Sequence, residues 1–296
     1  MTEITFEYDR FTRSYFTGEK IKGAVKVKTT EKIKPKEVTC TAYCIRTVDP
    51  NGHGLTSFDD PIPKVADRIV WQHNIPINPA PTVIEDGYTL PFEFTVPKES
   101  KMTESIRCKY ISVDYFVEFV IKRGLLSSDI VGTKGFFIVA DLDKNIPAGE
   151  PVEVNVNKVN PQRSMGKKAN FKAHIHFNTN VATFTKPPTG WITIVDSDTP
   201  IEAITVSYIR NETILIDRTN PQTLNSEKSR TYIAENDPPH GIQIPFNIEW
   251  SRIHISADLE TPLFSVSTSL KVRIVFTNGA YASTTIPLKL YHDLAY

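Results

Sequence analysis

The amino-acid sequence predicts an all-β protein made of two tandem β-sandwich lobes. Apolar residues recur at every second position along most of the chain, as expected for strands with one buried face. The 21 prolines separate many short segments, and helical periodicity is scarce. The chain also contains two similar series of segments, and its 296 residues are enough for two domains.

The internal repeat is clearest in the pattern apolar-Pro-Phe-polar-apolar. Its copies lie at residues 90–94 and 244–248. Three further pairs of segments occur in the same order in both halves: 21–27 with 188–194, 42–46 with 206–210, and 111–113 with 264–266. A shared order of several segments indicates two copies of one structural unit.

Composition excludes several classes of protein. The chain has 34 basic and 34 acidic side chains, so its net charge gives no general attraction to nucleic acid or anionic lipid. Residues 1–7 include acids and no apolar run, so we expect no secretory signal. No segment approaches the roughly 20 apolar residues of a membrane helix. The three cysteines do not suit a disulfide framework and predict a reducing, cytoplasmic location.

The first half contains a series of strand patterns interrupted by one irregular insertion. Strands are expected at residues 4–8, 24–28, 38–47, 66–74, 88–96, 109–123 and 133–140. Residues 49–64 form the insertion, since they are rich in Pro and Gly turn signals. Pro91 cannot donate a hydrogen bond to a neighbouring strand, which places 88–96 at a sheet edge or Pro91 at the start of its strand.

The second half begins after a stretch that has little to fill a core. Residues 141–151 are mostly polar, with Pro and Gly, so we place a short hinge there and the two lobes at 1–145 and 146–296. Residues 160–166 are an alternative boundary, after a strand at 152–156. Further strands are expected at 171–177, 190–195, 201–210, 230–234, 241–248, 263–276 and 281–290. This strand set implies one sandwich in each half.

Histidine and acidic pairs give weak signs of a catalytic or metal site. His174 and His176 share a strand face, a spacing that can hold zinc, but a third ligand is lacking nearby. A solvent-facing polar stripe is therefore the favoured interpretation. Asp196 and Asp198 precede Thr199-Pro200, which predicts a hairpin turn rather than catalytic carboxylates.

The remaining reactive residues also favour structural roles. Cys40 and Cys44 are expected to be buried core thiols, and Cys108 lies in no recognisable nucleophile motif. The lysines between residues 20 and 36 are expected to form a solvated face, with a basic patch for acidic lipid or an acidic partner as the alternative. Nucleophile elbow, Walker loop and zinc-protease motifs are missing from the sequence, so we expect a non-enzyme without cofactor or metal.

One connecting stretch has the composition of an interface centre. It follows the second Pro-Phe segment and contains Trp250, Arg252, Ile253 and His254, with Leu259 shortly after. Aromatic, Arg and large apolar side chains are enriched where partners dock. Packing of Trp250 into the sandwich is the competing interpretation.

Four stretches resemble the arrestin clan and, within it, the vacuolar protein sorting twenty-six family. They are the Pro-Phe-Glu-Phe strand at 90–94, the strand with a basic pair and two leucines at 117–130, the loop at 185–190 and the closing strand at 286–290. The resemblance covers nearly the whole chain and is nearest to the C-type, retriever branch. Gly124, where a serine is common, and the insertion at 49–64 depart from the family pattern.

This resemblance implies a subunit of an endosomal retriever or retromer coat that recycles cargo to the plasma membrane or the Golgi. Such a protein has no catalytic site and binds a helical-solenoid scaffold subunit through its second lobe. Carried over, the docking stretch is residues 250–262. Sorting nexins, cargo tails and the peripheral endosomal membrane are further implied partners. The alternative is an alpha-arrestin adaptor for ubiquitination, but the Pro-Pro pairs at 187–188 and 238–239 lack the Tyr of a Pro-Pro-x-Tyr motif.

Overall fold

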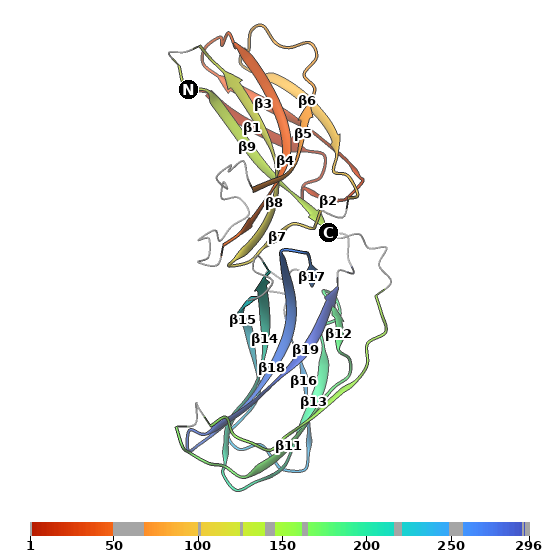
Figure 1. The fold of residues 1–296 in the computed structure, drawn as a ribbon, viewed down its shortest axis with the longest axis vertical. Coiled ribbons are helices and arrows are strands. Elements are labelled where there is room, and N and C mark those ends of the chain that lie inside the picture. Colours follow the sequence, from red (N-terminus) through yellow and green to blue (C-terminus); the bar gives the residue numbers. More distant parts are fainter. Residues whose placement is uncertain are drawn as a thin grey trace. The chain divides into compact units, whose positions relative to one another are not determined.

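The chain folds into β-sheets in two compact units (Figure 1). The computed structural model describes residues 2–49, 68–99, 102–124, 127–139, 146–161, 165–215, 221–248, 257–291 and 293. Unit 1 consists mainly of Met1–Asp141 and unit 2 of Leu142–Leu294. The predicted all-β tandem sandwich is confirmed. The expected hinge and boundary fall on or next to residues 140–145, which lie outside the described part, so their position stays a prediction.

Unit 1 consists of two sheets that share one core. Its strands are β1 (Thr2–Tyr8), β2 (Ser14–Phe16), β3 (Lys20–Thr29), β4 (Glu37–Val48), β5 (Ile69–Ile75), β6 (Tyr88–Thr95), β7 (Ile106–Arg107), β8 (Ile111–Lys122) and β9 (Ile130–Val139). One sheet has the order β1-β3-β6 and the other β2-β9-β8-β4-β5, with β7 beside β8. Phe94 of the first sheet contacts Phe136 of the second, with ring centroids 5.5 Å apart. The apolar face of each sheet thus packs against the other.

Unit 2 repeats this plan with one additional strand. Its strands are β10 (Val152–Val156), β11 (Phe171–Phe177), β12 (Val181–Thr183), β13 (Thr189–Ser197), β14 (Ile201–Ile214), β15 (Gln222–Glu235), β16 (Gln243–Asn247), β17 (Leu259–Glu260), β18 (Phe264–Phe276) and β19 (Tyr281–Tyr291). The sheet orders are β10-β11-β13-β16 and β12-β19-β18-β14-β15, with β17 beside β18. Phe171 and Phe276 bridge the two sheets at 5.0 Å.

The two units have the same strand topology. Strands β1 to β9 correspond in order to β11 to β19, and β10 is the addition at the edge of its sheet. The shortest strands also correspond, because β2 pairs parallel to β9 as β12 pairs parallel to β19. The four repeated segments of the sequence lie on the equivalent strands β3/β13, β4/β14, β6/β16 and β8/β18. The predicted duplication is therefore confirmed by strand pairing.

In unit 1, a glycine faces the phenylalanine of the Pro-Phe segment. Gly23 on β3 pairs with Phe92 on β6. A Cβ at position 23 would lie 2.4 Å from Cζ of Phe92 and 2.3 Å from the carbonyl oxygen of Glu7. The space above Gly23 is filled instead by the Phe92 ring, which contacts Tyr8 edge-on at 5.6 Å.

Unit 2 builds the same contact from its own residues. Gly190 on β13 pairs with Phe246 on β16. A Cβ at position 190 would lie 2.8 Å from Cζ of Phe246 and 2.0 Å from the carbonyl oxygen of His176. Phe177 contacts the Phe246 ring edge-on at 5.1 Å. The repeated Gly and Phe are thus two halves of one packing motif, which explains why both recur in the sequence.

The structure corrects the predicted turn at 196–200 and confirms the edge position of the strand that contains Pro91. The predicted hairpin at 196–200 is wrong, because β13 and β14 belong to different sheets. The turn instead carries the chain across the sandwich, and the Asp198 carboxylate accepts a hydrogen bond from the backbone N–H of Asn170 at 3.0 Å. Pro91 lies on β6, an edge strand of its sheet, as its missing N–H predicts.

The sequence patterns do not predict the shortest strands or the start of one longer strand. The strands β2, β7, β12 and β17 have only two or three residues each, too few for a visible alternation. Strand β15 begins at Gln222, eight positions before the expected start at residue 230. Its early part is polar and mostly exposed, and β15 lies at the edge of the sheet.

Candidate partner-docking site

Four of the five predicted docking residues lie outside the described part of the chain. These are Trp250, Arg252, Ile253 and His254. Leu259 is described: it is half-buried on β17 and pairs with Val266 on β18. Their role in binding stays a prediction, and the described residues show how the two flanks of the stretch are held.

Both flanks of residues 249–256 are fixed in the core of unit 2. On one side, Ile248 is fully buried, and its backbone N–H donates to the carbonyl of Pro188 at 3.4 Å. On the other side, Ala257 is only 6% exposed. Anchors that a rigid sandwich holds at both ends can bind a partner at a low ordering cost.

The segment after residues 249–256 forms a tight corner. The backbone N–H of Asp258 donates to Leu290 at 3.0 Å, and β17 then pairs with β18. The Thr261 hydroxyl donates to the carbonyl of Phe264 at 2.8 Å. Leu263, at the tip of this corner, leaves 38% of its surface exposed. The corner therefore presents an apolar side chain beside the predicted docking stretch.

A cluster of buried charged and polar groups lies under this corner. Arg210 on β14 is only 2% exposed and donates to the hydroxyl of Tyr208 at 2.8 Å. Glu212, two residues further along β14, is fully buried. Burial raises the pKa of the Asp258 carboxyl to about 6, although Thr268, Lys289 and Arg210 all act to lower it. Such buried charges tolerate few alternative arrangements of their neighbours.

Unit 1 has a buried ion pair at the equivalent place. Arg107 on β7 donates from Nε to Oδ1 of Asp114 on β8 at 2.6 Å, and their side chains are 8% and 4% exposed. Strands β7 and β8 correspond to β17 and β18. The duplication therefore retains a buried charged cluster at this end of each unit while changing the residues that form it. Neither cluster was predicted from the sequence. The available signal was the presence of inward-facing charges within apolar strands.

A comparison with protein families gives a match over the first unit. Residues 4–145 match the family model of the arrestin (or S-antigen) N-terminal domain. The fold is arrestin-like. The match spans unit 1, and the arrestin-like strand plan of unit 1 recurs in unit 2.

The histidine pair in the second arrestin-like unit lies on the outer face of its four-stranded sheet. His176 stacks on Trp191 at 5.0 Å, and His174 meets the same ring edge-on at 5.1 Å. Glu153 on β10 approaches both imidazoles, at 3.3 Å from His176 and 3.6 Å from His174. The described residues contain no group of three or more His, Cys, Asp or Glu suited to a metal ion. The pair thus belongs to an aromatic and polar stripe.

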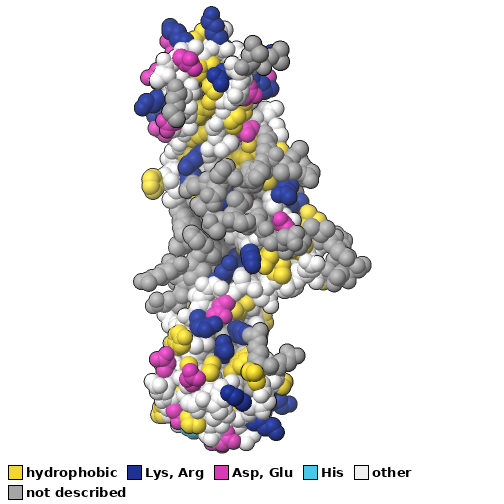
Figure 2. Space-filling model, turned by 90° about the vertical axis from the view of Figure 1, so that its left-hand side faces the viewer, with side chains coloured by type: hydrophobic (Ala, Val, Ile, Leu, Met, Phe, Trp, Pro, Cys, Tyr) yellow, Lys and Arg dark blue, Asp and Glu magenta, His cyan; other side chains and the backbone are white. Residues whose placement is uncertain are grey.

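The lysines of the first half form ion pairs along a solvated surface. Lys20 and Lys22 both contact Glu93, at 2.6 and 3.2 Å. Lys26 contacts Glu7 at 2.6 Å. On the visible face, side chains of both signs are interspersed over the described surface (Figure 2). This arrangement agrees with the predicted solvated face rather than with a basic patch.

The cysteines are buried, as predicted for Cys40 and Cys44. Cys40, Cys44 and Cys108 are each reduced and buried. Burial raises the pKa of the thiols of Cys40 and Cys44 to about 12. Because the thiolate is the reactive form, these two side chains suit packing rather than nucleophilic chemistry. Within the part of the chain described, no helix has the length and apolar character needed to cross a membrane.

Proposed function

We propose that the chain is a non-enzymatic subunit of an endosomal coat of the retriever or retromer type. It binds a helical-solenoid scaffold subunit of that coat and so supports the recycling of cargo from endosomes. The observation that carries the proposal is a duplicated arrestin-like sandwich with an arrestin N-terminal domain match at 4–145. Rigid sandwiches of this kind are suited to binding other proteins.

The docking surface in this proposal is the stretch 250–262 and its corner. Ile248, which precedes the stretch, and Ala257, which lies within it, are both buried and fix the chain on either side of residues 249–256. Trp250 and Arg252 supply the anchor types that dominate binding energy at interface centres. The exposed Leu263 adds apolar surface next to them.

A specific observation counts against the alternative of a ubiquitin-ligase adaptor. Pro187 and Pro188 lead directly into β13, and the Pro188 carbonyl accepts a hydrogen bond from Ile248. WW domains bind proline-rich peptides in an extended, accessible form. A Pro-Pro pair built into the sandwich does not offer such a ligand.

The test is a binding measurement with purified scaffold subunits of retriever and of retromer. We expect the chain to form a stable complex with one of them in size-exclusion chromatography and calorimetry. Trp250→Ala combined with Arg252→Glu should weaken the complex by about tenfold or more, because it removes an aromatic anchor and reverses a charge.

Matched controls lie away from the stretch. Phe11 is fully exposed in unit 1, and Lys158 is exposed in unit 2. Phe11→Ala with Lys158→Glu should leave the affinity unchanged. Equal binding by the stretch variant and the control variant would refute the docking assignment. Tight binding of WW domains without any scaffold binding would favour the adaptor instead.

A further inference from the structure

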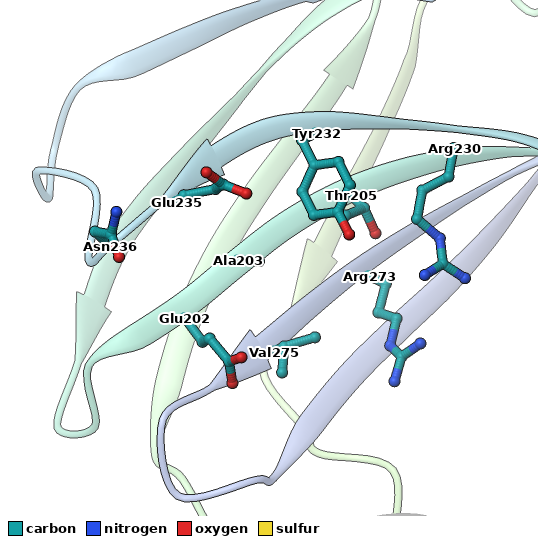
Figure 3. Close-up of a pocket in the computed structure, with 9 residues that line it drawn as sticks. All are labelled: Glu202, Ala203, Thr205, Arg230, Tyr232, Glu235, Asn236, Arg273 and Val275. Atoms are coloured by element: carbon teal, nitrogen blue, oxygen red, sulfur yellow. The ribbon is translucent and has the colours of Figure 1, made fainter.

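The outer face of the six-stranded sheet in unit 2 contains a groove that neither the docking stretch nor the buried charges explain. It has a volume of about 440 Å³ and is lined by side chains of β14, β15 and β18 (Figure 3). On β14, Ile204 and Val206 face the core, while Ala203 and Thr205 line the groove. The groove is therefore on the side of the sheet that does not pack against the rest of the sandwich.

Charges of opposite sign occupy the two ends of this groove. Glu202 and Glu235 lie toward one end, and Arg230 and Arg273 lie toward the other (Figure 3). The strand register agrees with this division. Glu235 is opposite Ala203 on β14, whereas Arg230 is opposite Ser207. Ala203 and Ser207 are four residues apart on β14, which corresponds to roughly 13 Å.

The middle of the groove contains two buried polar atoms that have no hydrogen-bond partner among the described residues. Thr205 is only 4% exposed, and its Oγ1 is buried without a hydrogen bond in the described part of the chain. The same holds for Nε of Arg273, which is opposite Thr205. Buried polar atoms in native proteins are nearly always paired, so a ligand in the groove is one partner that these two neighbouring atoms could take.

Arg273 is already positioned to receive an anion, whereas Arg230 is paired with a carboxylate of its own strand. The Arg273 guanidinium lies over the Tyr281 ring, 4.6 Å from its centroid, which holds the side chain in place. Arg230 is oriented by Glu227, with Nε and Oε1 2.7 Å apart. The exposed ring of Tyr232 forms a wall between the two ends of the groove. A carboxylate in the groove could accept from Nε of Arg273 and from the Thr205 hydroxyl once a small side-chain movement exposes these two buried atoms.

We propose that this groove binds an extended peptide segment of a partner protein that carries one acidic and one basic side chain on the same face. The acid contacts Arg273 and Thr205, and the base contacts Glu202 and Glu235. Side chains two residues apart in an extended peptide point to the same side and lie roughly 7 Å apart, which matches the two strand positions between Thr205, opposite Arg273, and Ala203, opposite Glu235. Side chains four residues apart, roughly 13 Å, reach from Ala203 to Ser207, opposite Arg230. Inorganic phosphate lacks the cation and would face two glutamates. This proposal goes beyond scaffold docking and involves different residues.

The test uses fluorescein-labelled ten-residue peptides of Ser, Thr and Val with blocked ends. One set carries Lys and Asp two or four positions apart, and the control set carries them three positions apart, on opposite faces. We expect the same-face peptides to bind the full-length chain about tenfold more tightly in anisotropy titrations. Peptides with Asp alone or Lys alone should bind as weakly as the opposite-face set.

Variants connect this binding to the groove. Arg273→Gln and Thr205→Val should each weaken the same-face peptides by about fivefold or more, since each removes a donor to the carboxylate. Lys158→Gln, on an exposed residue outside the groove, should have no effect. Circular dichroism and thermal unfolding verify that each variant is folded.

Several outcomes would overturn the proposal. They are equal affinity for same-face and opposite-face peptides, no binding by any peptide, and full binding by folded Arg273→Gln. Chemical-shift changes at Thr205 on adding inorganic phosphate alone, with displacement of the peptide, would identify a simple anion site and equally overturn it.

Discussion

Asp258 shows how burial changes the chemistry of a single side chain. Its backbone is held by β19, and its carboxylate is buried beside Thr268, Lys289 and Arg210. Burial raises its pKa from 3.8 to about 6, so desolvation outweighs the favourable neighbours. Since this carboxyl lies within the predicted docking stretch 250–262, its protonation also bears on the corner that the stretch forms with Phe264.

The raised pKa of Asp258 predicts a pH dependence of stability. The folded state holds this proton more tightly than the unfolded chain, so the stabilisation is present below pH 3.8 and is lost as pH rises through about 6. Asp258→Asn should match the parent near pH 4 and exceed its free energy of unfolding by roughly 2 kcal/mol near pH 7.5. Urea titrations of both proteins across this range measure the difference. A constant difference at every pH would contradict the burial of a charged carboxylate.

At the scale of strands, the repeated Gly and Phe explain how each sandwich closes. Gly23 on β3 leaves room for the ring of Phe92 on β6, and Gly190 on β13 does the same for Phe246. The Pro before each Phe lies on an edge strand, where its missing N–H costs no ladder bond. One short sequence pattern therefore sets the edge of a sheet and the packing of its neighbour.

Substitution of Gly23 tests this packing. Gly23→Ala would place a Cβ against both the Phe92 ring and a backbone carbonyl, so we expect a loss of roughly 1–3 kcal/mol in unfolding free energy. Gly124→Ala is the matched control, because nothing lies within 4 Å of its Cβ position. Chemical denaturation of the two variants compares them directly. Similar stabilities would show that the ring moves aside easily.

At the scale of the whole molecule, the chain consists of two units with the same topology and separate cores. The core of unit 2 contains Phe177, Tyr208 and Phe276, and that of unit 1 contains Ile21, Phe119 and Phe136. Each unit thus contains the buried surface that stabilises its own sheets. Function can differ between two such units, because their outer faces carry different residues.

Separate cores predict separate responses to mutation. Gly190→Ala should lower the protection of backbone amides of β13, β14 and β18 against hydrogen exchange in moderate urea, since the clash lies in unit 2. Protection of β3, β4 and β8 should stay within error of the parent chain. Mass spectrometry of peptides from both units reads the two responses in one experiment. An equal loss in both units would show that they unfold as one body.

The sequence by itself determined the fold class, the duplication and the structural role of the cysteines. Period-two alternation and turn residues are local properties, so they can be read along the chain. The stretch containing Trp250 could also be proposed from residue types alone. Only the tertiary structure decided which strands share a sheet, and hence that residues 196–200 cross the sandwich. The ion pair of Arg107 with Asp114 and the groove between Thr205, Arg230 and Arg273 likewise depend on pairing between separate strands. No local pattern encodes such pairing, because its energy comes from contacts that exist only after the chain has folded.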